Sequence, residues 1–319
     1  MPSDLGAFIF MNEKVVVTGA AGFIGSNLCK MLLREGYSVI AVDNLLAGTL
    51  ENLPHGVQFN QVDVCDSDFS RLVEGATAVF HLAARNCLDD CAKNPVDTAR
   101  INVMGTANVL QACVEYKIPH VIYSDTSAEY EGVDNFPSKT DEVKPMSIYA
   151  CSKRGGALMA EGFKNYYGLT VSTVRYFNVY GPAQDWRRVI PPVMSAFTIK
   201  LLEGQSPFIY GDGQKSRDFI HVDDINRFHL KLLTEKKIQG GTYNLGSGKE
   251  TSILEIFNKI ENEIKSGLKP IFKPELPGEA FRTLADISDT CRTGWRPEVE
   301  LEPGIKSFVA YTKERILSQ

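Results

Sequence analysis

Residues 15–25 read Val-Val-Val-Thr-Gly-Ala-Ala-Gly-Phe-Ile-Gly, an apolar run that passes directly into a glycine-rich turn. The β-branched run predicts a buried strand, and Leu28 and Leu32 continue the apolar spacing of a helix that follows the turn. The three glycines permit a tight turn and close approach to the backbone, and the unpaired N–H groups at a helix start attract phosphate. We therefore expect a dinucleotide pyrophosphate to bind at this turn.

The pattern of strand, turn and helix repeats through the first half of the chain. The expected strands are 15–18, 38–42, 57–62, 78–82, 121–124 and 171–174. Several are apolar on both faces, which favours parallel strands covered by helices on both sides. With right-handed crossovers these units predict an α/β fold built on a doubly wound parallel (Rossmann) sheet.

The regular alternation of strand and helix segments ends at about residue 178, after which proline and glycine interrupt the sequence more often. We expect a dinucleotide-binding Rossmann domain over residues 11–177 and a smaller C-terminal α/β substrate-binding domain over residues 178–319. Residues 218–235, a strand followed by a helix, are expected to return to the first domain. The first ten residues lack the basic start and long apolar stretch of a signal peptide and look like a tag or disordered leader.

The composition excludes several classes of partner. A net charge of −5 and a pI near 5.7 offer no basic field for nucleic acid. Seven cysteines, an odd number in mostly apolar segments, favour free thiols in a reducing compartment. Cys87 and Cys91 are spaced like metal ligands, but no second Cys/His pair accompanies them, so no metal is expected. No apolar run reaches the ~20 residues of a membrane span, so we expect a soluble, cytoplasmic protein.

Acidic residues end the second and third expected strands, at Asp43 and Asp63. The Asp43 carboxylate can accept hydrogen bonds from the adenosine ribose hydroxyls, and it would repel the 2′-phosphate of NADP. No arginine adjoins Asp43, so NAD is the expected cofactor. Asp63 would reach the adenine edge, and residues 81–84, His-Leu-Ala-Ala, would lie beside the cofactor. The alternative, in which the glycines only form turns and Asp43 is a surface cap, fits this context less well.

Tyr149 and Lys153 are four residues apart, so a helix would place them on one face. A nearby ammonium and the positive nicotinamide both favour phenolate, which brings the pKa of the phenol down from about 10 toward working pH. Lys153 can also hold the nicotinamide ribose. In a chain with 12 tyrosines this spacing can arise by chance. The place of the pair in the sequence favours a catalytic role. The pair follows Thr126, whose hydroxyl at the carboxyl end of a strand can bond a reacting oxygen.

Further motifs follow in order, namely RYFNVYGP at residues 175–182 and Gly-Asp-Gly with Arg-Asp-Phe within residues 211–219. Together with the Gly-x-x-Gly-x-x-Gly turn and the Tyr-Lys pair, they resemble an extended short-chain dehydrogenase/reductase. Within that group the chain resembles the NAD-dependent epimerase/dehydratase family, best known for UDP-glucose and UDP-N-acetylglucosamine 4-epimerases. The resemblance runs from about residue 13 to the C-terminus.

The resemblance implies functions for individual residues. Thr126, Tyr149 and Lys153 would be the catalytic residues. The cofactor would contact the glycine turn, the strand ends and the catalytic helix, through Gly19, Gly22, Phe23, Ile24, Gly25, Asp43, Asn44, Asp63, Val64, Leu82, Ala83, Ala84, Tyr149, Lys153 and Tyr176. A UDP-sugar would contact Arg85, Ser127, Ala128, Asn178, Val189, Pro191, Arg217, Arg282 and Thr283.

Within this second set, Asn178 would touch the diphosphate, and residues 189–191 would line the uracil pocket. Arg217 and Arg282 would bind the phosphates, because each guanidinium can donate a forked pair of hydrogen bonds. The alternative for either arginine alone is a solvated surface charge.

The implied reaction begins when Tyr149 removes the proton of the sugar 4-hydroxyl as hydride leaves C4 for NAD, giving a 4-keto sugar. Rotation of that intermediate and return of the hydride to its other face give the C4 epimer. Dehydratases and decarboxylases of the family place an acid after the catalytic Thr, whereas this chain has Ser127 and Ala128 there. Ala128 cannot move a proton, and a strand-like backbone would point Glu129 the opposite way. We therefore expect an epimerase, with a lyase as the alternative and an NAD-binding regulator without chemistry as the third hypothesis.

The identity of the sugar is open between a UDP-hexose, a UDP-N-acetylhexosamine and a UDP-uronate. Arg85 could pair with a sugar carboxylate, but uronate-acting relatives carry an Arg near position 185, which is Asp185 here. Thr283 stands where a bulky residue would exclude an N-acetyl group. Ile148 in place of a usual Pro and Glu131 in place of a usual Gly indicate a reshaped site.

The resemblance also implies a homodimer, formed through helices near residues 103–116 and 152–167.

Overall fold

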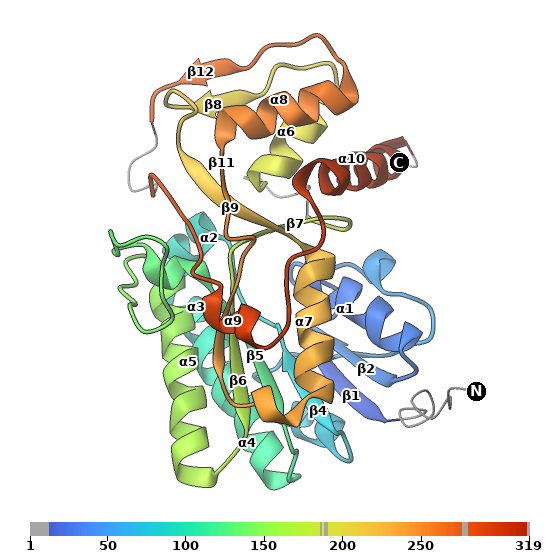
Figure 1. The fold of residues 1–319 in the computed structure, drawn as a ribbon. Helices are drawn as coiled ribbons and strands as arrows, with labels where there is room; N and C mark the ends of the chain where they lie inside the picture. Colours follow the sequence, from blue (N-terminus) through green and yellow to red (C-terminus); the bar gives the residue numbers. More distant parts are fainter. Residues whose placement is uncertain (1–12, 186, 188–190, 276–279, 318–319) are drawn as a thin grey trace, which may run out of the picture. The chain divides into compact units, whose positions relative to one another are not determined.

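The computed structural model describes residues 13–185, 187, 191–275 and 280–317. A seven-stranded sheet has the order β10-β6-β5-β4-β1-β2-β3 (Figure 1). The strands are β1 Lys14–Thr18, β2 Ser38–Asp43, β3 Gln58–Gln61, β4 Ala78–His81, β5 Val121–Thr126, β6 Val171–Tyr176 and β10 Thr242–Leu245. β1 pairs in parallel with both β2 and β4, so the chain winds outward from β1 in two directions. This topology confirms the predicted doubly wound α/β fold.

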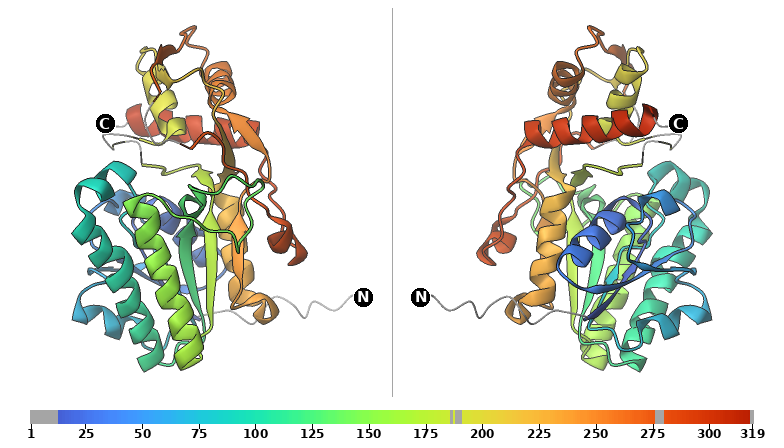
Figure 2. Two further views of the ribbon diagram at one scale, coloured as in Figure 1. Left: turned by 90° about the vertical axis from the view of Figure 1, so that its left-hand side faces the viewer. Right: turned by 90° about the vertical axis from the view of Figure 1, so that its right-hand side faces the viewer.

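Helices cover both faces of the sheet because the strand side chains alternate between them. α4 (Thr106–Glu115) and α5 (Ile148–Tyr167) lie side by side in Figures 1 and 2. Along β1, Val16 belongs to the apolar cluster formed with these two helices. α1 (Phe23–Arg34) packs on β1 and β2 with Leu28 and Leu32 buried.

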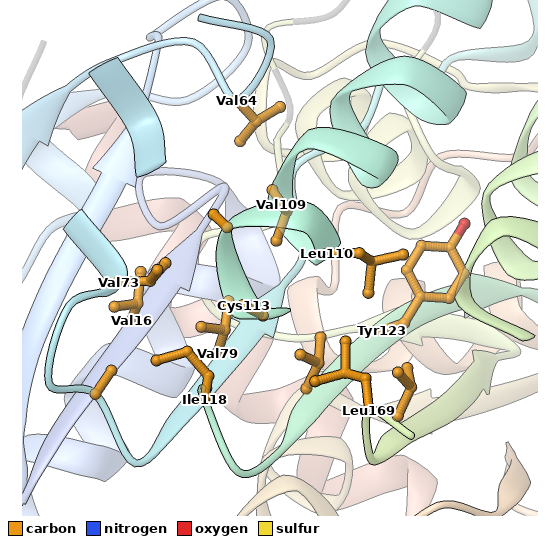
Figure 3. Packing of buried hydrophobic residues seen from close by; sticks show 14 of the residues in the cluster. Val16, Val64, Val73, Val79, Val109, Leu110, Cys113, Ile118, Tyr123 and Leu169 are labelled. Atoms are coloured by element: carbon orange, nitrogen blue, oxygen red, sulfur yellow. The ribbon is translucent and has the colours of Figure 1, made fainter. Parts of the chain in front are cut away.

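The cluster beneath α4 and α5 combines apolar side chains from several strands with apolar side chains from the helices (Figure 3). Val16, Val79 and Tyr123 come from β1, β4 and β5, and Val109 and Leu110 come from α4. All five are completely buried, so each contributes on the order of 2 kcal/mol of apolar transfer free energy. This packing holds β1, β4 and β5 in place, and with them the carboxyl ends of these strands.

The chain forms two compact units. Unit 1 contains residues up to Ser124, together with Cys151–Thr173 and His229–Gly241. Unit 2 contains Asp125–Ala150, Val174–Phe228 and the residues from Thr242 onward. The remaining elements of unit 1 are the helices α2 Leu88–Lys93 and α3 Pro95–Ala99, the π-helical turn η3 Arg100–Gly105, and the short helices η1 Leu50–Asn52, η2 Ser67–Val73 and η5 Lys236–Ile238.

Unit 2 has its own sheets and core. A three-stranded sheet has the order β11-β9-β7, and β12 pairs in parallel with β8. The strands are β7 Asn178–Tyr180, β8 Phe208–Tyr210, β9 Ser216–His221, β11 Glu250–Ser252 and β12 Ile271–Lys273. The helices are η4 Ser127–Tyr130, α6 Val193–Leu202, α8 Ile253–Ile264, α9 Ser288–Arg292 and α10 Leu301–Leu317, and α7 Val222–Thr234 begins in this unit. α6, α8 and α10 lie together in Figure 1 around a core that includes Phe197, Phe257 and Phe308.

The structure corrects the sequence prediction in one region. The expected strands 121–124 and 171–174 each continue for two more residues, to Thr126 and Tyr176. These extensions contain the charged residues Asp125 and Arg175, which pair with each other while buried and therefore do not end the strands. The strand-like backbone expected after Thr126 is wrong, because residues 127–130 form a 3₁₀ turn that the Thr126 hydroxyl caps by accepting from Ala128 N–H (3.1 Å).

Candidate active site

The glycine turn after β1 has the shape that a pyrophosphate requires. Gly19 adopts a left-handed φ of 68° and approaches the backbone of Leu82 and Ala83 so closely that a Cβ there would collide with it. A Cβ at Gly25 would collide with the carbonyl of Gly19. Gly22 is the N-cap of α1, and because it has no side chain it leaves room beside the first N–H groups of the helix. Phe23 and Ile24 open that helix, so the residues of this turn fit a bound dinucleotide.

Two carboxylates stand at the ends of β2 and β3. Asp43 is buried and accepts from the N–H groups of Ala21 (3.0 Å) and Leu45 (2.8 Å). Burial raises the pKa of Asp43, and these two hydrogen bonds oppose that shift. Asp63 accepts from the Asn44 side-chain amide (3.1 Å), which joins the two predicted adenosine contacts.

Asp63 also accepts from Cys65 N–H, 2.9 Å away. Burial alone would raise the pKa of Asp63, but its hydrogen bonds and the neighbouring Arg100 hold that pKa below the usual value. Val64 is buried beside it. Two carboxylates therefore lie at the strand ends where the adenosine ribose is predicted to bind.

A buried hydrogen-bond chain ties the end of β4 to its neighbours. Ala83 N–H donates to the Thr18 hydroxyl (3.2 Å), which lies 2.8 Å from His81 Nδ1. His81 Nε2 lies 3.0 Å from the Thr106 hydroxyl, which donates its own proton to Asn102 O (2.7 Å). Nε2 is therefore assigned the imidazole proton, and Nδ1 accepts from Thr18. The chain fixes the backbone from Leu82 to Ala84 beside the glycine turn.

Lys153 follows Tyr149 by one turn on α5, so both residues face the same side of that helix, as predicted. The Lys153 side chain is buried, with its ammonium 4.4 Å from the centroid of the Tyr123 ring. The Tyr123 hydroxyl donates to Lys153 O (2.9 Å) and anchors the helix backbone there. Burial lowers the pKa of His81 to about 3, and the Lys153 charge acts in the same direction. The imidazole is thus neutral and leaves the positive charge to Lys153.

Asn102 is a functional candidate that sequence reasoning missed. Its side-chain oxygen accepts from Arg85 N–H (2.8 Å), and its amide donates to Arg85 O (2.9 Å) and Ser152 Oγ (2.8 Å). It therefore locks the segment after β4 to the residue next to Lys153. A polar residue on the apolar face of residues 101–110 was the available signal.

Thr126, Ser127 and Ala128 end β5 and begin η4, and the next residue is held by a charge network. Glu129 is fully buried, and its carboxylate lies 2.8 Å from Arg175 Nη2. Arg175 also binds Asp125 (3.0 Å). Burial raises the pKa of the neighbouring Tyr176 well above its usual value, and the charges of Asp125 and Tyr149 add to that shift.

The predicted diphosphate residues gather around β7 and β9 in unit 2. The Asn178 amide donates to Thr283 Oγ (3.1 Å) and to Asp218 O (3.2 Å). Arg217 Nη1 donates to Ser216 O (2.9 Å) and to Phe281 O (3.4 Å).

Arg282 pairs with Glu250, whose second oxygen lies 2.9 Å from Nη2, and its guanidinium lies over the Phe136 ring. Pro191 precedes α6, and Val189 lies outside the described residues.

Arg85 is engaged within unit 1. Asp90 binds its guanidinium at two points (2.6 and 3.1 Å), and Asp97 binds a third nitrogen. Asp97 also binds Arg100 (3.0 Å), so the two carboxylates and the two guanidinium groups form one network. A sugar carboxylate would therefore have to compete with both carboxylates.

The sequence model of the family described as "NAD dependent epimerase/dehydratase family" matches residues 15–246, more than half of the chain. The chain belongs to this family. UDP-glucose 4-epimerase from Thermotoga maritima, solved with UDP-glucose, is 33% identical with a TM-score of 0.91, covering 95% of this chain and 99% of that one. UDP-N-acetylglucosamine 4-epimerase from Methanobrevibacter ruminantium, solved with UDP-N-acetylmuramic acid, is 32% identical with a TM-score of 0.92, covering 96% and 100%.

A third relative, UDP-glucuronic acid 4-epimerase from Bacillus cereus, was solved with UDP-glucuronic acid and NAD. It is 31% identical with a TM-score of 0.88, covering 95% of this chain and 99% of that one. The family confirms the resemblance read from the sequence and NAD as the cofactor, and the relatives confirm the type of enzyme, an NAD-dependent epimerase. The three relatives differ in the sugar.

The structure also bears on disulfides, metal ligands and membrane-spanning helices. None of the seven cysteines, all of which lie in the described part of the chain, is joined in a disulfide. Within the described residues, no three His, Cys, Asp or Glu side chains gather as metal ligands would. Among the described helices, none combines the length and the apolar character that crossing a membrane requires.

Proposed function

We propose that this protein is a UDP-sugar 4-epimerase that works through a 4-keto intermediate. The observation that carries the proposal is the pairing of buried Glu129 with Arg175, in a chain that already has Ala128 at the position of a lyase acid. The Tyr149 and Lys153 pair on α5 supports the oxidation and reduction that an epimerase and a lyase share.

Each catalytic residue has a role that follows from its chemistry. Tyr149 takes the proton of the sugar 4-hydroxyl, and Lys153 stabilises the phenolate through its positive charge. His81 is neutral, so it adds no positive charge beside Lys153. Thr126 orients the reacting oxygen through its hydroxyl. Bound NAD supplies the acceptor and the donor of hydride at C4.

The product of the proposed reaction is an epimer because neither Ser127 nor Ala128 is an acid that could protonate a leaving group. Elimination of water or loss of carbon dioxide from a 4-keto sugar requires an acid or base next to the intermediate. Ala128 has no such group. Moving Glu129 toward a sugar would break its ion pair with Arg175 inside a buried site.

We favour a neutral sugar, a UDP-hexose or UDP-N-acetylhexosamine, over a UDP-uronate. Arg85, the candidate partner of a sugar carboxylate, is already neutralised by Asp90 and Asp97. Thr283 is a small residue held by Asn178, which is compatible with an N-acetyl group. Uracil as the base is supported by the UDP-sugars bound to the relatives.

We also propose a homodimer formed through α4 and α5. Exposed apolar side chains on α5 support this interface, with Leu158 51% and Tyr166 83% exposed. Sedimentation should give the mass of two chains, and Leu158→Glu should give the mass of one.

The function is tested by incubating the NAD-loaded protein with UDP-glucose, UDP-N-acetylglucosamine and UDP-glucuronate, and identifying products by mass spectrometry and NMR. An epimer of equal mass is expected from at least one neutral sugar, and loss of water or carbon dioxide would refute the proposal. Tyr149→Phe should lower kcat on the order of a thousandfold, because general base catalysis contributes 10²–10⁴-fold. Tyr167→Phe, on an exposed part of the same helix, is the matched control and should keep full activity.

A further inference from the structure

The segment between η4 and α5 is closed at its base by two backbone hydrogen bonds. Lys144 N–H donates to Glu129 O (2.7 Å), and Gly132 N–H donates to Lys144 O (3.0 Å). These hydrogen bonds join the start of the segment, which follows Thr126, to its end, which precedes Tyr149. Both ends lie in unit 2.

Glu131 extends this closure with its side chain. One carboxylate oxygen accepts from the N–H groups of Met146 (3.2 Å) and Ser147 (2.7 Å), and the other accepts from the Ser147 hydroxyl (2.9 Å). Ser147 Oγ in turn accepts from Ala150 N–H (3.1 Å), as a cap of the first turn of α5. We call these contacts of Glu131 and Ser147 the helix clamp.

The two residues that flank Ser147 are exposed, so packing holds them only weakly, whereas Ala150 is buried. Met146 is 66% exposed and Ile148 is 44% exposed. Ile148 also lacks the fixed φ that a proline would give at the first position of a helix. The carboxylate stands at the positive end of a 20-residue helix, so its hydrogen bonds are charge-assisted. The clamp therefore restrains the first residues of α5, ahead of the anchors at Ser152 and Lys153.

From this arrangement we propose that Glu131 is a positioning residue for Tyr149, an inference that rests on the proposed epimerase function. Tyr149 lies between Ser147, which Glu131 binds, and Ala150, which Ser147 caps. Glu131 thereby sets the place of the phenol relative to the strand end that carries Thr126. A displacement of about 1 Å at a reacting group can cost about a hundredfold in rate.

The test compares Glu131→Ala, Glu131→Gln and Glu142→Ala in the NAD-loaded protein. Glu142 is the matched control, since it is an acid of the same segment that binds Asn135 (3.0 Å) and not the helix start. Two readouts are taken: hydrogen exchange of the amides of residues 146–150, and kcat and KM for the sugar that the wild type epimerises.

Glu131→Ala should speed exchange in residues 146–150 and lower kcat ten- to a hundredfold, with KM changed less than about twofold. Glu131→Gln, which keeps one acceptor oxygen, should lie between Glu131→Ala and the wild type in both readouts. Glu142→Ala should match the wild type. If Glu131→Ala does not fold, Glu131→Gln and Ser147→Ala carry the same test, because Ser147→Ala removes the cap of Ala150.

Faster exchange without a fall in kcat, or an equal fall in kcat for Glu142→Ala, would overturn the positioning role. A wild type that is inactive on every UDP-sugar would instead overturn the proposed function, and with it the catalytic role of the clamp.

Discussion

The two units bury polar groups of different kinds. Among the described residues, unit 1 buries mainly neutral groups, including His81, His120 and His229. Its buried charges, Asp43 and Lys153, are both predicted cofactor contacts. Unit 2 buries Asp125, Glu129, Arg175, Lys215, Asp218 and Asp224. The side chains of Asp125, Glu129, Arg175, Asp218 and Asp224 each bond to another residue of the same unit.

This difference indicates how each unit keeps its shape. In unit 1 apolar layers hold the strands, and charge is buried at positions predicted to face a ligand. In unit 2 ionic and charge-assisted bonds connect loops, as where Asp218 accepts from Ser247, Gly248 and Ala285 N–H groups. We therefore expect unit 2 to be more sensitive to removal of a charge and unit 1 to be more sensitive to acid.

The largest effect is expected from Arg175→Met in unit 2. It leaves Asp125 and Glu129 buried without their cation and should lower the free energy of unfolding by about 3–5 kcal/mol in urea. Arg292→Met, at an exposed ion pair, should change it by less than about 0.5 kcal/mol. Equal effects of the two variants would remove the distinction between the units.

The next effect is expected from Asp218→Asn. The carboxylate accepts from three backbone N–H groups and the Ser247 hydroxyl, and an amide would turn a donor toward some of them. A loss of about 2–3 kcal/mol is expected in the same assay. Asp212→Asn, at an exposed turn, is the control and should stay within about 0.5 kcal/mol. An unchanged free energy of unfolding in Asp218→Asn would contradict the proposal that this carboxylate holds the loops of unit 2 together.

Acid should act through the buried histidines, of which His81, His120 and His229 lie in unit 1 and His221 lies in unit 2. Burial lowers the pKa of His81 and His229 to about 3 and that of His120 to about 4, from 6.5. Above pH 6.5 both folded and unfolded states are neutral at these sites. Below it the unfolded state binds protons that the folded state excludes, so stability falls as the pH drops toward the folded values.

Each histidine should cost about 2 kcal/mol between pH 7 and 5. His229→Phe, beside Phe80, should remove one such contribution and flatten the pH dependence of unfolding. An unchanged slope would show that His229 is protonated in the fold.

The smallest effect is expected at Asp43, a buried charge of unit 1 that is predicted to contact the cofactor. Asp43→Asn removes the charge at the end of β2 but keeps one acceptor for Ala21 or Leu45. The preference for NAD over NADP should fall about tenfold in binding titrations, because a carboxylate repels a 2′-phosphate. Exposed Asp66→Asn should leave the preference unchanged. An unaltered preference in Asp43→Asn would remove the proposed role of this carboxylate.

The sequence was sufficient for much of unit 1. The turn at residues 15–25 and the β-branched runs carry local signals, because strand periodicity and glycine geometry depend on neighbours in the chain. The spacing of Tyr149 and Lys153 is likewise local to one helix. Their roles, like those of the other predicted site residues, stay predictions.

The internal contacts of unit 2 could not be predicted in this way. Arg175 meets Glu129 across 46 positions of sequence, and Arg282 meets Glu250. The residues next to a charged side chain in the sequence do not show whether that side chain is solvated or forms a buried ion pair with a distant residue. The 3₁₀ turn after Thr126 was missed for the same reason, since its cap and its buried Glu129 depend on tertiary partners.

The most direct measurement uses a UDP-hexose carrying deuterium at C4, incubated with the NAD-loaded protein in ordinary water and followed by NMR and mass spectrometry. We expect a C4 epimer of unchanged mass with the deuterium still at C4, because the hydrogen that leaves C4 returns to it. An epimer that has lost the deuterium to solvent, or a product lacking water or carbon dioxide, would contradict the proposed mechanism.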